Sequence, residues 1–240
     1  MKYLRVYAFF SRTIRVVPPT HPYDGQRVRE TGTYTGMQEA VTACKDVVDS
    51  LVFVAPPMVY RSVEDTSVDD VQMLTKACLH DLHNAVRTVI PLMKQRRSGT
   101  IVAVTSDYAV SAVPDVAAYA AATAAMNAYV RAVAVECCKY GIRGNCVMTG
   151  FNTAENADRF REYCPEVDAE SAFDHYQVLQ RGGTAADVAN AVLFCASSMS
   201  NAILGECFPV DGGALAIGHS QVWPPRDRPV FTLSLKEKKS

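Results

Sequence analysis

Short apolar runs separated by long helical stretches restrict most strongly what this chain can fold into. Residues 51–55 (LVFVA) and 100–105 (TIVAVT) carry no charge and show no alternation of apolar and polar side chains. Such runs are typical of parallel strands that are covered on both faces. Further strands are predicted at residues 2–10, 144–148 and 207–210.

Helix start signals lie between these runs. Ser67 with Asp70 and Thr184 with Asp187 have capping-box spacing, which predicts helices to about residues 95 and 198. Thr35 with Gln38 predicts a further helix over 37–49, and the longest helix is expected at 117–140. The segment 16–36 is rich in Pro and Gly and is predicted to be a loop. Strands alternating with helices indicate an α/β fold with a doubly wound, Rossmann-like parallel sheet.

Composition narrows the class of protein. The chain has 240 residues with a net charge of −1, which favours one domain and neither nucleic acid nor an anionic membrane as partner. Its eight cysteines include no Cys-x-x-Cys pair, so reduced thiols and no metal site are expected. The N-terminal apolar stretch is too short and too charged for a signal peptide. We therefore expect a cytoplasmic protein, with a domain over 1–215 and a tail over 216–240.

Residues 50–215 resemble the short-chain dehydrogenase/reductase family. The segment SGTIVAVTSDYAVSAVPDVAAYAAATAAMNAYVRAVAVECCKYGIRGNCVMTG is similar to the family's central block, and GECFPVDGG is similar to its last strand. In that block the resemblance places the family's catalytic serine at Ser106 and its tyrosine at Tyr119. It implies a Rossmann fold and an oxidoreductase ancestry.

The catalytic positions depart from the family pattern. The family's lysine, four residues after the tyrosine, is replaced by Thr123, and its helix asparagine by Cys78. A free tyrosine has a pKa near 10, and the lysine's positive charge is what favours the phenolate. Thr149 stands where the family has proline. Ser106 and Tyr119 are therefore interpreted as vestigial, with no functional catalytic residue expected.

The dinucleotide-binding half departs further. After the first strand no glycine occurs before Gly25, although the pyrophosphate of a dinucleotide needs a glycine-rich turn. The family's Asn-Asn-Ala-Gly motif falls on residues 53–56 (FVAP), about thirty residues early, which is roughly one βαβ crossover. A truncated N-terminal half that binds no cofactor is predicted. Residues 11–35 are expected to fill the vacated cleft, with Pro18, Pro19 and Tyr23 near it.

The surface then suggests a role in assembly. Over residues 117–138 only Arg131 and Glu136 are charged, which favours burial of this helix on more than one side. In the family this helix contacts another subunit, so we expect interface residues there, in the last strand and in the tail. They are Tyr119, Met126, Tyr129, Val133, Phe208 and Trp223.

A non-catalytic structural or regulatory subunit is the leading hypothesis. Its partner would be an intact, homologous short-chain dehydrogenase that binds NAD and acts on a hydroxyacyl-CoA-type alcohol, in a heterotetramer. One alternative is a cofactor-independent enzyme that uses Ser106 and Tyr119. Another is a module that binds an acyl-CoA-type ligand in the emptied cleft.

Overall fold

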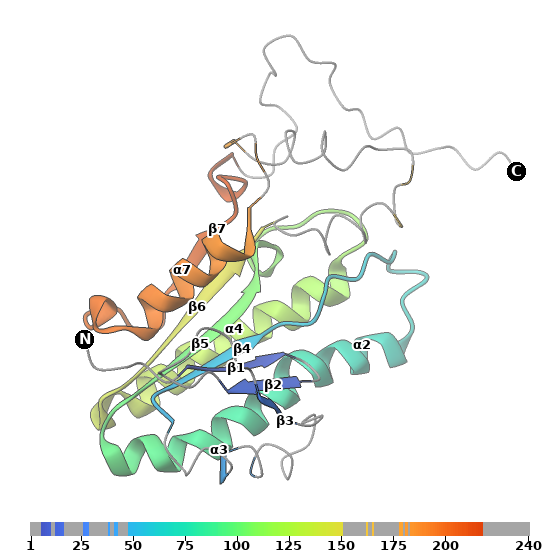
Figure 1. Ribbon diagram of the computed structural model, residues 1–240. Helices are drawn as coiled ribbons and strands as arrows, with labels where there is room; N and C mark the ends of the chain where they lie inside the picture. Colours follow the sequence, from blue (N-terminus) through green and yellow to red (C-terminus); the bar gives the residue numbers. More distant parts are fainter. Residues whose placement is uncertain are drawn as a thin grey trace, which may run out of the picture.

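The computed structural model describes residues 6–10, 13–16, 26–28, 38, 41–42, 48–150, 162, 165, 178–179, 181 and 183–217. Their strands form one seven-stranded sheet in the order β3-β2-β1-β4-β5-β6-β7, flanked by helices (Figure 1). The expected α/β, Rossmann-like fold is confirmed. No helix in these ranges is long and apolar enough to span a membrane.

The strands β4 to β7 run parallel to one another, as their apolar sequences predict. They are β4 (Ser50–Val54), β5 (Gly99–Ser106), β6 (Ile142–Thr149) and β7 (Cys207–Val210). Every residue of β5 is buried, because the strand lies between β4 and β6 and is covered on both faces. The uninterrupted apolar sequence of β5 thus correctly predicted a parallel strand that is buried on both faces.

The other edge of the sheet is built differently. Strand β1 (Val6–Phe10) pairs in parallel with β4, but β2 (Thr13–Val16) and β3 (Gln26–Val28) follow as antiparallel neighbours. Only two residues separate β1 from β2, and Phe10 pairs with Thr13. The prediction of an unbroken loop over 16–36 is therefore wrong at Gln26–Val28. A short segment without strong alternation gains strand structure here by pairing with a neighbour.

Two of the three predicted helix starts are confirmed, and the third, at Thr35, lies outside the described residues. Ser67 begins α2 (Val68–Thr75) and Thr184 begins α7 (Ala185–Ala196), each with a complete capping box. A π-helical turn over Lys76–His80 joins α2 to α3 (Asp81–Arg96), and α4 (Ala117–Cys137) is the longest helix of the described residues. Residues 38, 41 and 42 are helical, within the helix expected over 37–49.

The helices cover the two faces of the sheet unequally. On one face α2, α3 and α4 pack against strands β4 to β6 around a large core that includes Leu51, Ile101 and Met126. On the other, α7 covers a smaller core of residues from β4 to β7, such as Val102 and Val147 (Figure 1). The larger core is the one that receives the side chains from the family's catalytic positions.

Two of the expected interface residues belong to this core. Met126 is fully buried and Tyr119 is 6% exposed, so their side chains have almost no surface to offer another subunit. This corrects their assignment as contact residues: they lie on the face of α4 that packs on its own sheet. Tyr129, Val133 and Phe208 are half-buried and remain candidates, whereas Trp223 lies outside the described residues.

Candidate functional site

Ser106 ends β5 and begins a short 3-10 turn over Asp107–Ala109. Its hydroxyl accepts a hydrogen bond from the Tyr108 amide at 3.2 Å and donates one to Asp107 Oδ1 at 3.1 Å. The side chain is 5% exposed. The serine is thus held at the carboxyl end of the central strand, where ligands of parallel α/β sheets bind.

Tyr119 projects from the first turn of α4 toward the loop that follows β4. Its hydroxyl donates a hydrogen bond to the carbonyl oxygen of Pro56 at 3.3 Å. Pro56 occupies the last position of the FVAP segment, where the resemblance places the family's Asn-Asn-Ala-Gly motif. The segment at that position therefore contacts the tyrosine hydroxyl.

Thr123 lies one turn further along α4 and is fully buried. Its hydroxyl donates to the carbonyl oxygens of Tyr119, at 3.0 Å, and Ala120, at 3.2 Å. Both acceptors belong to the backbone of the same helix. The position that carries the family's lysine thus holds an uncharged side chain that folds back onto its own helix.

The surroundings of Tyr119 raise the pKa of its phenol. Burial is the largest cause, and the negative charge that Cys78, Asp107 and Tyr60 would carry when ionised acts in the same direction. A hydrogen bond with Ser106 lowers the pKa, but by less. Tyr119 is therefore a protonated hydrogen-bond donor near neutral pH.

Cys78 lies at the position of the family's helix asparagine, in the π-helical turn between α2 and α3. It is fully buried, and burial, followed by the charge of Asp81, raises the pKa of its thiol to about 12. The π-helical turn brings this thiol close to Tyr119, as its effect on the tyrosine's pKa indicates. A neutral thiol can contribute little charge stabilisation to a reaction.

Asp107 adds an acidic group to this cluster. It is 2% exposed, and burial raises the pKa of its carboxyl to about 7, against the hydrogen bond from Ser106 and together with the charge of Asp211. Gly150, which follows β6, leaves the space between these two acids: a Cβ there would lie 2.9 Å from Asp211 Cα and 3.2 Å from Asp107 Oδ2. The glycine of the family's Pro-Gly pair is thus kept for packing while the proline is replaced by Thr149.

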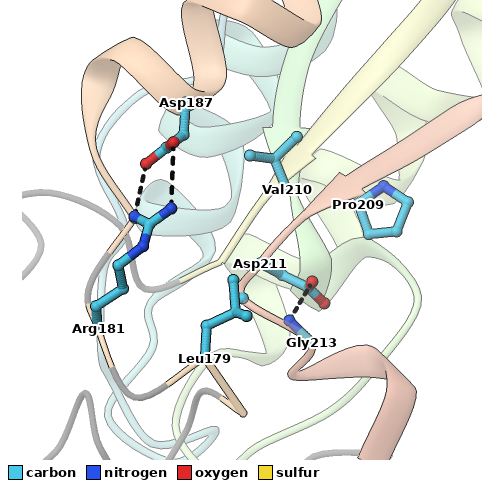
Figure 2. Close-up of a pocket in the computed structure, with 9 residues that line it drawn as sticks. Leu179, Arg181, Asp187, Pro209, Val210, Asp211 and Gly213 are labelled. Atoms are coloured by element: carbon cyan, nitrogen blue, oxygen red, sulfur yellow. Dashed lines mark hydrogen bonds and ion pairs between the residues drawn. The ribbon is translucent and has the colours of Figure 1, made fainter.

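A cavity of about 400 Å³ opens at the carboxyl end of β7. Figure 2 shows Arg181 turned toward Asp187 of α7, with Asp211 and Gly213 on the opposite wall. Arg181 Nη1 lies 2.9 Å from Asp187 Oδ2, and Asp211 accepts hydrogen bonds from the amides of Gly213 and Leu215. The charged side chains of the cavity are therefore engaged with one another or with backbone.

The structure gathers Ser106, Tyr119, Thr123 and Cys78 around one end of α4, as the resemblance implies. Pro18, Pro19 and Tyr23, expected near this site, lie outside the described residues. The described parts of 11–35 extend the sheet as β2 and β3, and the filling of a cleft by this segment stays a prediction. Sequence reasoning missed Asp107, although a charged residue directly after a buried, uncharged strand is a usable signal.

His80 and His83 lie three residues apart, at the junction of the π-helical turn and α3. The His83 ring, through Nδ1, shares a hydrogen bond with the Tyr129 hydroxyl at 2.9 Å and meets the tyrosine ring edge-on. Within the described ranges, no three His, Cys, Asp or Glu side chains gather closely enough to hold a metal ion. The contact between His83 and Tyr129 therefore joins α3 to α4 on the outer surface.

Comparison with known protein sequences supports the same family as the motifs. A family model described as enoyl-(acyl carrier protein) reductase matches residues 28–214. The cyclopentanol dehydrogenase of Comamonas sp. is 28% identical over 183 residues, 76% of this chain and 72% of that protein. A Xanthobacter autotrophicus protein called inactive 2-(S)-hydroxypropyl-CoM dehydrogenase 2 is 31% identical, over 66% of this chain and 69% of its own.

A solved structure gives the same result. The chain superposes on an oxidoreductase of the short-chain dehydrogenase/reductase family from Burkholderia thailandensis with a TM-score of 0.69. The two are 30% identical, and the match covers 76% of this chain and 70% of the other. The chain is a member of the short-chain dehydrogenase/reductase family.

Proposed function

We propose that this chain is a non-catalytic, cytoplasmic subunit of an oxidoreductase complex. Its partner in a heterotetramer would be an intact short-chain dehydrogenase that binds NAD and oxidises a hydroxyacyl-CoA-type alcohol. The single observation that carries the proposal is Thr123, which is buried and bonded to its own helix where the family needs a cation. Without that cation the phenol of Tyr119 stays protonated and cannot act as a base near neutral pH.

The residues that would hold a dinucleotide do not fit one. A dinucleotide's pyrophosphate sits on a glycine-rich turn that leads into a helix N-terminus. Here two residues, Ser11 and Arg12, separate β1 from the antiparallel strand β2, which leaves no length for such a helix. After β4, the carbonyl oxygen of Pro56 accepts a hydrogen bond from the Tyr119 hydroxyl. We therefore derive no hydride-transfer step in this subunit and assign NAD to the partner.

The exposed side of α4 supports the role in assembly. Ala121, Ala128 and Ala132 lie on it, and Val135 is 65% exposed. Small side chains allow the backbone of a second helix to approach closely, and an apolar exposed stripe is typical of a contact surface. Tyr129 and Val133, half-buried at the margin of this stripe, would border the partner's helix. Phe208 of β7 would contribute to a second contact.

The names of two relatives are consistent with this assignment. One carries the word inactive in its name, and the other is a dehydrogenase that acts on an alcohol. The proposed pair resembles 2-(α-hydroxybenzyl)succinyl-CoA dehydrogenase of anaerobic aromatic degradation, in which a cofactor-free subunit accompanies an intact one. That likeness is the source of the substrate class in the proposal.

Calorimetric titration with NAD and NADP tests the proposal. The chain alone should bind neither, whereas the complex purified after co-expression with neighbouring dehydrogenase genes should bind NAD at one site per partner subunit. In the complex, Tyr119→Phe in this chain should leave turnover unchanged, while the same change at the partner's catalytic tyrosine should abolish it. Micromolar NAD binding by the chain alone would overturn the proposal.

Asp107 favours a second candidate, a cofactor-independent enzyme. Its carboxyl has a pKa near neutrality and bonds to Ser106, so it could exchange a proton with a ligand placed next to both. Against this candidate stands the burial of Asp107, Ser106 and Tyr119, each less than a tenth exposed. Turnover of an acyl-CoA-type substrate by the isolated chain, lost on Ser106→Ala, would favour it over the structural role.

A further inference from the structure

Cys146 and Cys207 lie directly opposite each other on the parallel strands β6 and β7. Side chains at paired positions of parallel strands point to the same face, and both cysteines pack on the α4 side of the sheet. Adjacent strands are about 4.8 Å apart, within the range of about 4.4–6.8 Å that separates the Cα atoms of a disulfide. A bond between the two sulfurs therefore needs little movement of the backbone.

A cation lies next to one of the two sulfurs. Arg131 of α4 approaches Cys207 with Nη2 3.8 Å from Sγ, while its Nε donates to the carbonyl oxygen of Gly205 at 3.3 Å. The hydrogen bond to Gly205 holds the guanidinium over the start of β7. The positive charge is thereby fixed where it favours a thiolate at Cys207.

The two thiols also differ in their surroundings. A hydrogen bond from Cys146, followed by the charge of Arg131, lowers the pKa of Cys207 against the effect of burial. The same hydrogen bond and burial raise the pKa of Cys146. Cys207 is half-buried, whereas Cys146 is 1% exposed. One thiol is thus ionisable and reachable, and the other is a protonated neighbour shielded from solvent.

We propose that Cys207 is an oxidation site and that Cys146 is its resolving thiol. Hydrogen peroxide is the oxidant: the Cys207 thiolate attacks one peroxide oxygen, the O–O bond breaks, and hydroxide leaves, which is protonated to water. The sulfenic acid at Cys207 is then attacked by the Cys146 sulfur. The S–O bond breaks, and the departing hydroxyl group takes the Cys146 proton and leaves as a second water. The product is a disulfide that joins β6 to the edge strand β7.

Other described cysteines lack this combination. Cys78, Cys137 and Cys195 are buried, and Cys138 is exposed, but its thiol donates to the carbonyl oxygen of Val135. Cys138 is therefore a suitable internal reference for reactivity. The proposal rests on the pairing across β6 and β7, independently of the role assigned to the whole chain.

The experiment is brief treatment of the full chain with hydrogen peroxide, alkylation of the remaining thiols, and peptide mass spectrometry. The expected product is a Cys146–Cys207 cross-link that forms before Cys138 is modified and is reversed by dithiothreitol. In Cys146→Ser, the sulfenic acid at Cys207 should persist and be trapped by dimedone. In Cys207→Ser, Cys146 should remain unmodified at the same dose.

Arg131 gives the matched pair of variants. Arg131→Met should slow oxidation of Cys207 about two- to fivefold, as loss of a partly exposed charge partner implies, and Arg131→Lys should keep most of the rate. Circular dichroism of both variants controls for folding. The proposal is overturned if Cys207 oxidises no faster than Cys138, or if wild type accumulates sulfenic acid without the cross-link.

Discussion

Thr123 and Asn127 lie one turn apart on the inner face of α4, and both are buried. Asn127 bonds outward: its Oδ1 accepts from the Thr105 hydroxyl of β5 at 2.8 Å, and its amide contacts the Met148 sulfur of β6 at 3.5 Å. Within the described part of the chain, the Thr123 hydroxyl bonds to the backbone of its own helix. The Asn127 turn thus ties the helix to two strands, whereas the Thr123 hydroxyl bonds within α4.

The difference separates residues that hold the fold from residues that perform chemistry. A buried asparagine that satisfies polar groups on two strands stabilises the native packing whether or not the protein catalyses a reaction. A lysine beside a catalytic tyrosine is retained only for its charge, because an unpaired buried ammonium destabilises the fold. In a chain without catalysis, as proposed here, the Thr123 turn could therefore change more freely than the Asn127 turn.

The same contrast divides the sheet. Strands β4 to β7 keep a parallel arrangement with a continuous apolar core, whereas β1 is followed by the antiparallel strands β2 and β3. The retained half contains the packing residues, and the altered half is the one that would bind a dinucleotide in the family. Substitutions of Thr123 and Asn127 therefore test most directly whether packing residues and residues at the family's catalytic positions contribute differently to stability.

Thr123→Lys should have the largest effect. The side chain at this position is fully buried, so an ammonium there would lack water and a designed counter-ion. We expect a loss of about 3–5 kcal/mol in the free energy of unfolding, measured by urea denaturation, and no NAD-dependent activity. The isosteric Thr123→Val should stay within about 1 kcal/mol of wild type. Full stability of the lysine variant would show that a solvated cleft still exists beside Tyr119.

Asn127→Ala should destabilise more than the matched Thr123→Ala. The first change removes the acceptor of the buried Thr105 hydroxyl and leaves a cavity, which together cost about 3 kcal/mol. The second removes a methyl group and a hydroxyl whose acceptors belong to the same helix, at about 1 kcal/mol. Equal losses in urea denaturation would contradict the division of α4 into a structural and a vacated turn.

The scaffold could be predicted from sequence because its signals are local. The apolar run of β5 and the capping boxes at Ser67 and Thr184 each depend on a few adjacent residues, and the structure confirms them. The catalytic positions could be located by their spacing from Tyr119. The strands β2 and β3 could not, since β2 depends on pairing with β1 and β3 on pairing with β2, and neither on alternation in its own sequence.

The roles of particular side chains on α4 were harder to predict. The apolar composition of the helix does not reveal which of its residues face the sheet, so Met126 was assigned to an interface although it is buried in the subunit's core. Asp107 was overlooked because its importance comes from neighbours distant in sequence, Asp211 and Gly150. Such contacts exist only once the strands are brought together.

The smallest expected effect concerns Asp107 and pH. Its pKa is raised from 3.8 to about 7 in the folded protein, so between these values the folded state keeps a proton that the unfolded state has lost. Stability should therefore fall as the pH rises from about 4 to about 7 and change little above that. In Asp107→Asn this slope should flatten, and at pH 8 the variant should be more stable than wild type by on the order of 2 kcal/mol.

Unfolding by urea at a series of pH values measures this difference. Glu64→Gln is the control, the same loss of a carboxyl group at an exposed position. A steep profile that persists in Asp107→Asn would assign the titration to another group. If instead Asp107→Asn is destabilised at pH 8, the ionised carboxylate stabilises the site through its bonds to Ser106 and the turn. The Tyr119 end of α4 would then be a stabilising polar site like the Asn127 turn, and the contrast between the two turns would fail.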